Sequence, residues 1–416
     1  MPAAGTRALP YPGAMEAGTL AAALRVRTSP RRLAFAGLAG ATICNFLAVG
    51  AAIPVLPRYV KGPVGSGDVE VGIVVGAFAL AAIVSRPLAG RLADARGRRN
   101  VLVAGMALSS VAGMLLFVPG GVPMLIAARL VLGVADGAVF TAGAAWTVDV
   151  APAERRGRVI GLFGLAVWTG MTLGPAIGEA LYSAGGYELV WAFTVLSPLA
   201  GIALAWRLED RFEAHPATGP RPLIPRPAIR PGISLMLANF GYAAMAGFLV
   251  LHLDARGIGH GAAVFVAFAA GVVGARLLLG RLPDVLGPRV SAPGAGAMEA
   301  LGLVIIALAP SLPLALAGAV VMGTGFSLLY PSLALAVVSR VPESRRGAAL
   351  GAFTAFFDAG VGFGAPLAGV AVTLGDGYAA AFWLAAAAAV AGAVLTIANR
   401  AMPGPTTGAA AFGEPA

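Results

Sequence analysis

The chain has 416 residues, of which 58% are hydrophobic and only 12% are charged, and its mean hydropathy is +0.85. This composition excludes a soluble monomer, because a water-solvated surface of that size needs far more charge. The net charge of +10 comes almost entirely from arginine, since Lys61 is the one lysine among 29 basic residues. The arginines stand in short clusters between apolar stretches and form no basic face, so nucleic acid is not an expected partner.

The residues that usually carry metal or catalytic chemistry are scarce. The single cysteine, Cys44, excludes an intrachain disulfide and any multi-cysteine metal site. His215, His252 and His260 are far from one another in the sequence and fall in or beside expected loops, so they support no metal site. Neither a nucleotide-binding glycine loop nor a Ser-His-Asp arrangement is visible. We therefore expect no metal, no cofactor and no enzymatic activity.

Twelve apolar runs are long enough to cross a bilayer, which takes about 20 mostly apolar residues in a helix. They predict an all-α integral membrane protein with twelve transmembrane helices. The last four runs are alanine-rich and less sharply delimited, so ten or eleven spans remain compatible with the pattern. The predicted spans are residues 34–57, 71–89, 101–118, 123–146, 158–182, 188–206, 232–253, 261–279, 290–310, 312–338, 348–373 and 378–399.

The distribution of arginine predicts the orientation, since short cytoplasmic loops retain positive charge. Placing both termini inside leaves only Arg58, Lys61 and Arg256 on the opposite side. The preference for arginine over lysine is typical of a GC-rich bacterial genome, so we expect a multi-pass protein of a bacterial inner membrane with both termini in the cytoplasm. The cytosolic arginine clusters would lie within residues 25–32, 91–99, 155–158, 207–230 and 340–346.

One long polar segment divides the chain. Residues 207–231 are rich in proline and charge, which excludes a membrane helix and predicts a cytoplasmic linker. Residues 31–206 and 232–400 then form an N-terminal and a C-terminal six-helix bundle. Residues 1–30 and 401–416 are expected to be disordered cytosolic tails.

The two halves contain an internal repeat. The run GRLADARGRR, which begins at Gly90, recurs 190 residues later as GRLPDVLGPR, which begins at Gly280, and Arg86 recurs as Arg276. Several glycines and an Arg-Arg-Gly sequence recur at the same offset, in the same order. Two homologous bundles related by an axis along the membrane normal are a transporter architecture, with the substrate site near the midplane where they meet.

These repeated loops resemble the signature cytoplasmic loop of the major facilitator superfamily, and the resemblance extends from about Leu33 to Arg400. It implies that Asp94 pairs near Arg345 at the start of the eleventh span when the outward mouth is open, and that Asp284 does the same near Arg155. The alternative is that these charges only enforce topology. The residues expected to form this gating latch are Gly90, Arg91, Asp94, Gly97, Arg98, Arg99, Asp284 and Arg345.

The fourth span carries a second motif. In RLVLGVADG, Arg129, Gly133 and Gly137 share one helix face and resemble another motif of the family, whose members use this arginine in proton coupling. An arginine inside a span costs about 2.5–3.5 kcal/mol unless it finds a partner or water. The counterpart of Arg129 in the repeat is Ala319, so the fold itself does not require the arginine.

The fifth span resembles the antiporter motif of the drug/proton antiporter branch, in which a final Gly-Gly is usual. Here the last position is Glu179, which leaves the substrate open. The alternative is that these small residues serve only close helix packing and that the proline bends the helix. The motif consists of Gly161, Gly170, Gly174, Pro175 and Gly178.

Three acidic residues fall near the middle of predicted spans: Asp136, Glu299 and Asp358. A proton-coupled carrier needs a carboxyl group that is protonated in one orientation and charged in the other. Their counterparts in the repeat are Phe326, Ser109 and Trp168, so the acids break the symmetry that the scaffold obeys. We rank Asp136 first as the proton carrier, Asp358 second and Glu299 third. Arg129 is expected to take part in the proton coupling. The alternative for each is a buried acid satisfied by a neighbouring hydroxyl or arginine.

The favoured function is a proton-coupled efflux antiporter that exports a small amphipathic drug or metabolite by alternating access. The alternative is a proton symporter that takes up a small polar solute, and a membrane receptor or enzyme is a more distant one. The expected partners are a small-molecule substrate, protons and the lipid bilayer, with the monomer as the functional unit. Residues expected to line the substrate cavity are Asn45, Asn239, Tyr242, Phe326, Tyr330 and Phe357.

Overall fold

The structure is a computed structural model that describes residues 30–150, 156–208, 225–342 and 346–398. Within these ranges the secondary structure is helical, without a β-strand, as the sequence predicts. The helices are α2 (Pro30–Ala52), α3 (Leu56–Lys61), α4 (Asp68–Arg96), α5 (Arg98–Leu115), α6 (Gly121–Val150), α7 (Arg156–Trp206), α8 (Arg226–Ala238), α9 (Phe240–Ala255), α10 (Gly261–Leu278), α11 (Leu282–Leu286), α12 (Pro288–Leu308), α13 (Leu312–Val338), α14 (Arg346–Leu374) and α15 (Ala379–Ala398).

All twelve predicted apolar runs overlap these helices, although not one to one. The runs 158–182 and 188–206 are the two arms of α7, which folds back where Gly185 and Gly186 leave helical geometry. Gly186 has a φ of 68°, a conformation that glycine adopts without steric cost. The run 232–253 is divided at Asn239 into α8 and α9.

Ten helical stretches in the described part of the chain are long and apolar enough to cross a membrane, which makes this a multi-pass membrane protein. Residues 159–206 count once among the ten although they contain both arms of α7. The helix α5 is not among them, because its 18 residues begin with Arg98, Arg99 and Asn100, which lower its mean hydropathy. The count of twelve spans therefore stays a prediction.

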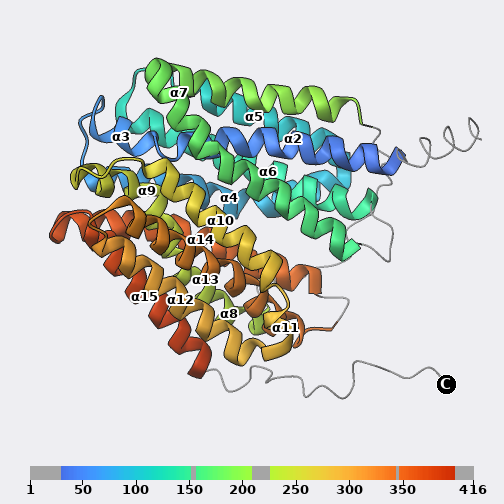
Figure 1. Cartoon of the computed structure of the whole chain (residues 1–416). Helices are drawn as coiled ribbons and strands as arrows, with labels where there is room; N and C mark the ends of the chain where they lie inside the picture. Colours follow the sequence, from blue (N-terminus) through green and yellow to red (C-terminus); the bar gives the residue numbers. More distant parts are fainter. Residues whose placement is uncertain (1–29, 151–155, 209–224, 343–345, 399–416) are drawn as a thin grey trace, which may run out of the picture.

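The helices form two groups that follow the order of the chain (Figure 1). Helices α2–α7 make the first helix group and α8–α15 the second. The predicted linker, residues 207–231, ends earlier than expected, since α8 begins at Arg226. Residues 209–224 lie outside the described residues, as do almost all of the two predicted tails.

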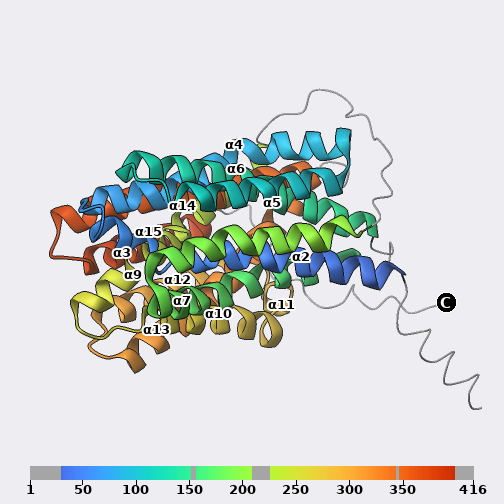
Figure 2. The same cartoon turned by 90° about the horizontal axis from the view of Figure 1, so that it is seen from above.

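In the first helix group, α2 lies between the two arms of α7 (Figures 1 and 2). Glycines bring the two backbones together: a Cβ atom on Gly174 would lie 2.7 Å from the Cα of Gly50, and one on Gly178 would lie 2.1 Å from the carbonyl oxygen of Ala51. Larger side chains would force the helices apart.

The two helix groups meet mainly where α4 contacts α14 and where α7 contacts α10. The contact of α4 with α14 is again made through glycines, since a Cβ atom on Gly72 would lie 2.2 Å from the carbonyl oxygen of Ala365. This contact lies toward the end of the molecule that holds α3, which we call the Arg58 side. The opposite end, with the turn between α4 and α5 and with α11, is the Arg98 side (Figure 1).

The two copies of the repeated loop turn in the same way. Gly97, between α4 and α5, has a φ of 95°, and Gly287, between α11 and α12, has a φ of 69°. Only glycine adopts these values without strain, so the matching glycines are a requirement of the turn.

The glycine contacts of α7 predict an unequal response to alanine. Replacing Gly178→Ala should lower the stability by about 1–3 kcal/mol, because the new methyl group collides with α2. Replacing Gly161→Ala adds a methyl group with nothing within 4 Å and should leave the stability unchanged or slightly higher. The melting temperature of the purified protein in detergent measures both, and equal shifts would contradict the packing role of Gly178.

Candidate functional site

A cavity of about 480 Å³ lies between the two helix groups. Its size is typical of a small-molecule site. Side chains from α2, α4, α6 and α7 form one wall, and those from α9, α10, α13 and α14 form most of the other. Ile160, Gly161 and Gly164, at the first turns of α7, line the cavity toward the Arg98 side. The charged side chains in its lining are Arg86, Arg129, Arg276, Asp136 and Asp358.

Arg86 joins the two helix groups at the wall of this cavity. Its Nε donates to Oδ2 of Asp358 at 2.7 Å, and its Nη2 donates to Oδ1 of Asp358 at 3.1 Å and to Oδ2 of Asp136 at 3.2 Å. Both aspartates are 3% exposed. Since Arg86 and Asp136 belong to α4 and α6 while Asp358 belongs to α14, these contacts form an interaction between the groups that we call the Arg86 bridge.

Close packing of α4 against α6 lets Asp136 reach Arg86. A Cβ atom on Gly133 would lie 2.1 Å from the carbonyl oxygen of Phe78, and one on Gly137 would lie 2.1 Å from Oγ of Ser85. The two glycines of the second motif therefore lie directly on α4, which carries Arg86. The guanidinium of Arg86 also covers the ring of Phe140, which follows Asp136 by one turn of α6, at 4.7 Å from the ring centre.

Arg129 lies on the same face of α6 but has no acidic partner among the described residues. Its Nε donates to the carbonyl oxygen of Val74 at 3.3 Å, and its guanidinium lies 4.8 Å from the centre of the Phe78 ring. As its spacing from Asp136 suggests, the two do not pair directly, although both line the cavity.

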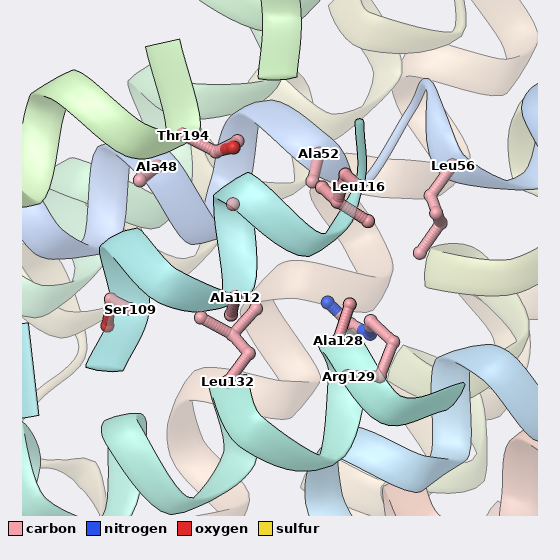
Figure 3. Close-up of a pocket in the computed structure, with 11 residues that line it drawn as sticks. Ala48, Ala52, Leu56, Ser109, Ala112, Leu116, Ala128, Arg129, Leu132 and Thr194 are labelled. Carbon is pink, nitrogen blue, oxygen red and sulfur yellow. The ribbon is translucent and has the colours of Figure 1, made fainter. Parts of the chain in front are cut away.

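Arg129 also borders a second, much smaller cavity, of about 20 Å³ (Figure 3). Ala52, Ala112 and Leu116 surround it together with the arginine. This volume holds about one water molecule. This smaller cavity is thus large enough for a water molecule at the guanidinium but not for a substrate.

The three predicted mid-span acids do not share one place. Asp136 and Asp358 meet at Arg86. Glu299, on α12, does not line the cavity: it is fully buried, close to Gly241 of α9, and both its carboxyl oxygens lack a hydrogen-bond partner in the described part of the chain. The position of Glu299 away from the cavity therefore does not support its predicted role as a proton carrier.

Five of the six residues expected at the substrate cavity line it, and Asn45 does not. Asn45 is fully buried, and its amide has no hydrogen-bond partner among the described residues. Phe46 and Val49 are the α2 residues that reach the cavity, and Asn45 points about 100° away from its neighbour Phe46. The five residues in the lining are Asn239, Tyr242, Phe326, Tyr330 and Phe357.

Arg86 is one of two charged cavity residues, with Arg276, that sequence reasoning missed. It lies inside the predicted span 71–89, so the cost of a charge in the membrane was the available signal, as it was for Arg129. Arg86 also recurs as Arg276 in the repeat, and for that reason it was interpreted only as part of the scaffold.

On the Arg58 side a second set of charges joins the two groups. Nη1 of Arg58 lies 2.8 Å from Oε2 of Glu179, and its Nε lies 2.8 Å from Oδ2 of Asp254. Arg58 and Glu179 are in α3 and α7, whereas Asp254 is in α9, so this Arg58 clamp also crosses between the groups. Glu179 is the residue that replaces the final glycine of the expected antiporter motif. Aromatic rings of Tyr59, Tyr182, Tyr187 and Trp191 contact one another beside the clamp.

On the Arg98 side the repeated loop makes contacts within its own group. Asp94 pairs with Arg98, whose Nε also lies 3.1 Å from Oδ2 of Asp149. Nη1 of Arg99 donates to the carbonyl oxygen of Leu208 at 3.1 Å. The implied partner of Asp94, near Arg345, lies outside the described residues, as does Arg155.

The glycines of the fifth-span motif divide between two places. Gly170, Gly174 and Gly178 lie against α2, where they allow close packing. Gly161 lies in the cavity lining, with open space at its Cβ position. Packing therefore explains three of the glycines without any role in transport.

Comparison with known proteins gives consistent results for the whole chain. The sequence profile described as "Major Facilitator Superfamily" matches residues 38–297 and 232–414. An uncharacterized MFS-type transporter of Salmonella typhimurium is 31% identical over 371 residues, which cover 86% of this chain and 94% of the relative. A similarly named protein of Pseudomonas aeruginosa is 32% identical over 366 residues, covering 86% and 90% of the two chains.

Solved structures share the fold at low sequence identity. The nucleoside transporter NupG has a TM-score of 0.72 at 14% identity, over 88% of this chain and 99% of that one. A bacterial homolog of the human lysosomal transporter Spinster, in an inward-facing and unoccupied conformation, has a TM-score of 0.70 at 16% identity, over 89% and 95%. The human organic anion transporter TETRAN has a TM-score of 0.67 at 16% identity, over 89% and 100%.

The Arg86 bridge predicts that loss of the arginine strongly destabilises the protein and that removing the two aspartate charges restores stability. Replacing Arg86→Gln leaves two carboxylates close together without a cation and should destabilise the protein by about 3 kcal/mol or more. Adding Asp136→Asn and Asp358→Asn removes the unpaired charges and should restore much of the loss. Thermal unfolding in detergent tests both, and a triple variant no more stable than Arg86→Gln would show that these charges are not coupled.

Proposed function

Since the chain belongs to the major facilitator superfamily, we propose that it is a proton-coupled transporter that exports a small amphipathic compound. Twelve membrane helices in two six-helix bundles would alternate between an outward-open and an inward-open state. The protein would act in the inner membrane of a bacterium, with both termini in the cytoplasm, and bacterial relatives support that location.

The Arg86 bridge is the observation that carries this proposal. Asp358 holds the second helix group to Arg86 of the first through two hydrogen bonds. A proton on Asp358 would remove the charge that makes this contact strong and so weaken the bond between the groups. Protonation would then shift the balance between the two states by their difference in stability. Asp136, the preferred proton carrier, accepts a hydrogen bond from the same guanidinium, so a proton on Asp136 would weaken the bridge as well.

The arginine clusters favour an orientation with the Arg98 side in the cytoplasm and the Arg58 side outside. In this orientation the Arg58 clamp closes the outer face, and the cavity extends toward the cytoplasm. The state would be inward-open, like the conformation named for the Spinster homolog. Such a state accounts for Asp94 pairing with Arg98 in its own group, since the latch would cross between the groups only when the outward mouth opens.

Export is favoured by the resemblance of the fifth span to the antiporter motif, in which Gly161 lies at the cavity. Uptake by proton symport is the alternative, supported by the packing of the other motif glycines and by Glu179 at the last position. Everted vesicles distinguish the two directions, because an imposed proton gradient drives accumulation of the substrate only by an antiporter.

The proposal predicts that Asp136→Asn uncouples transport from protons while the substrate still binds. A susceptibility panel in a pump-deficient host first identifies exported compounds. Everted vesicles are then acidified inside, and acridine orange reports the loss of protons when such a compound is added. We expect the response to fall at least tenfold in Asp136→Asn, because an amide cannot carry the proton.

Glu188→Gln serves as the matched control, because Glu188 is exposed and does not line the cavity. It should retain the response of the unmodified protein. An unchanged response in Asp136→Asn would remove Asp136 from the coupling scheme. If protons and substrate instead move in the same direction, the protein is a symporter and the antiporter proposal is wrong.

The Arg58 clamp predicts a shift toward the outward-open state when it is broken. In a Cys44→Ser background, Val361→Cys places a thiol in the cavity lining. Arg58→Gln should make this thiol react about fivefold faster with a membrane-impermeant maleimide added to intact cells, since a partly exposed ion pair contributes about 1 kcal/mol.

Lys61→Gln is the control for the clamp, because Lys61 forms an ion pair with Asp68 on the same side but within the first helix group. Its labelling rate should match that of the parent. If Arg58→Gln also reacts at the parent rate, the clamp does not hold the outer face closed.

A further inference from the structure

Arg276 occupies in α10 the place that Arg86 occupies in α4, 190 residues earlier. Both arginines line the cavity. Arg86 makes three hydrogen bonds to two aspartates, whereas Arg276 has no ion-pair or hydrogen-bond partner in the described part of the chain. The two copies of the repeat therefore present to the same space one guanidinium that is paired with carboxylates and one, on the exposed Arg276, that is not.

The repeat also shows why Arg276 lacks a partner. The positions that correspond to Asp136 and Asp358 are Phe326 and Trp168, respectively. Both aromatic residues line the cavity, with their ring centres 5.6 Å apart in an edge-to-face arrangement. Where one copy surrounds its arginine with carboxylates, the other supplies aromatic surface.

The charges of the cavity do not balance. Three arginines and two aspartates line it, and no lysine, histidine or glutamate does, so one positive charge remains when both aspartates are ionised. Protonation of either aspartate increases the excess. Arg276 is exposed, so water can solvate its charge, and a guanidinium also binds carboxylate and related oxyanions with two parallel hydrogen bonds.

Further aromatic rings adjoin Phe326 in the cavity lining. The Phe326 ring lies 6.0 Å from those of Tyr242 and Phe357, between ring centres. Tyr330 follows Phe326 by one helical turn and lines the cavity together with Arg86 and Arg276. A ligand with an apolar ring at Phe326 would thus have a cation available at one end.

We propose that the cavity binds an amphipathic organic anion: one carboxylate or sulfonate joined to an apolar ring system. Its anionic group binds Arg276, in the place that the aspartates take at Arg86, and its rings contact Phe326 and Trp168. This assignment names the substrate class of the proposed transporter and rests on that function, but the binding preference is measurable without transport.

The test is ligand binding to the purified full-length protein in detergent. The probes are benzoate, naphthoate and anthracene carboxylate, each beside its neutral carboxamide and its methylammonium analogue. Dissociation constants come from the concentration dependence of the melting temperature. We expect at least one carboxylate to bind about tenfold or more tightly than its matched amide and amine, since a hydrogen bond to a charged group contributes that much. No preference for carboxylates in any of the sets would overturn the proposal.

Substitutions test whether Arg276 is responsible for the preference for carboxylates. Arg276→Gln should abolish it, and Arg276→Lys should retain much of it because the charge remains. Phe326→Asp should also abolish it, since it gives Arg276 an internal carboxylate at the position that corresponds to Asp136. Arg226→Gln is the matched control: this exposed arginine does not line the cavity, and its loss should change nothing.

The set of variants still tests the proposal if one of them fails to fold. If Arg276→Gln does not fold, Phe326→Asp and Arg276→Lys still decide, and an anion preference that survives Phe326→Asp would remove Arg276 as the binding group. Anion binding without proton movement in vesicles would contradict the transporter mechanism alone. Proton-coupled export of amines, with no preference for anions in the binding assay, would contradict the substrate class alone.

Discussion

The arrangement of this protein depends on one constraint: a charge inside the membrane must have a partner or water. Arg86 meets this requirement with Asp136 from its own helix group and Asp358 from the other. The pairing that makes the charges tolerable is therefore also a bond between the groups. Any change in the charge of either aspartate alters the stability of that bond, and so links protonation to the relative positions of the two groups.

Glycine makes this bridge geometrically possible. Gly137 lies so close to Ser85 that a Cβ atom would be 2.1 Å from its hydroxyl oxygen, and a Cβ atom on Gly76 of α4 would lie 2.6 Å from the carbonyl oxygen of Gly362 in α14. Both contacts lie within three helical turns of Arg86 along α4, on the way to its two acids. Bulkier residues would move Asp136 and Asp358 beyond hydrogen-bond distance. The glycines that allow close helix packing therefore also bring Asp136 and Asp358 within reach of Arg86.

The sequence predicts the helices and the repeat because hydropathy and glycine turns are local properties, and it predicts the two cavity acids because they break the symmetry of the repeat. Arg86 was missed for the opposite reason: it obeys that symmetry, and its role depends on Asp358, which is remote in sequence. Asn45 was wrongly expected at the cavity because hydropathy does not reveal which face of α2 is turned inward. In the proposed mechanism the partner of Asp94 changes with the conformation, which no local pattern encodes.

The two interactions between the groups differ in a way that suits alternating access. The Arg58 clamp lies at one end and is partly exposed, so solvent screens it and it contributes little. The Arg86 bridge is buried, so its strength depends steeply on the charge of its aspartates. A weak clamp cannot keep the outer face closed by itself when the bridge is lost. In the proposed transporter the buried bridge would therefore control the opening, and the clamp would set only how far the resting balance lies toward the closed outer face. This division requires that the ionizable groups sit at the cavity and not at the gate, which is where the structure has them.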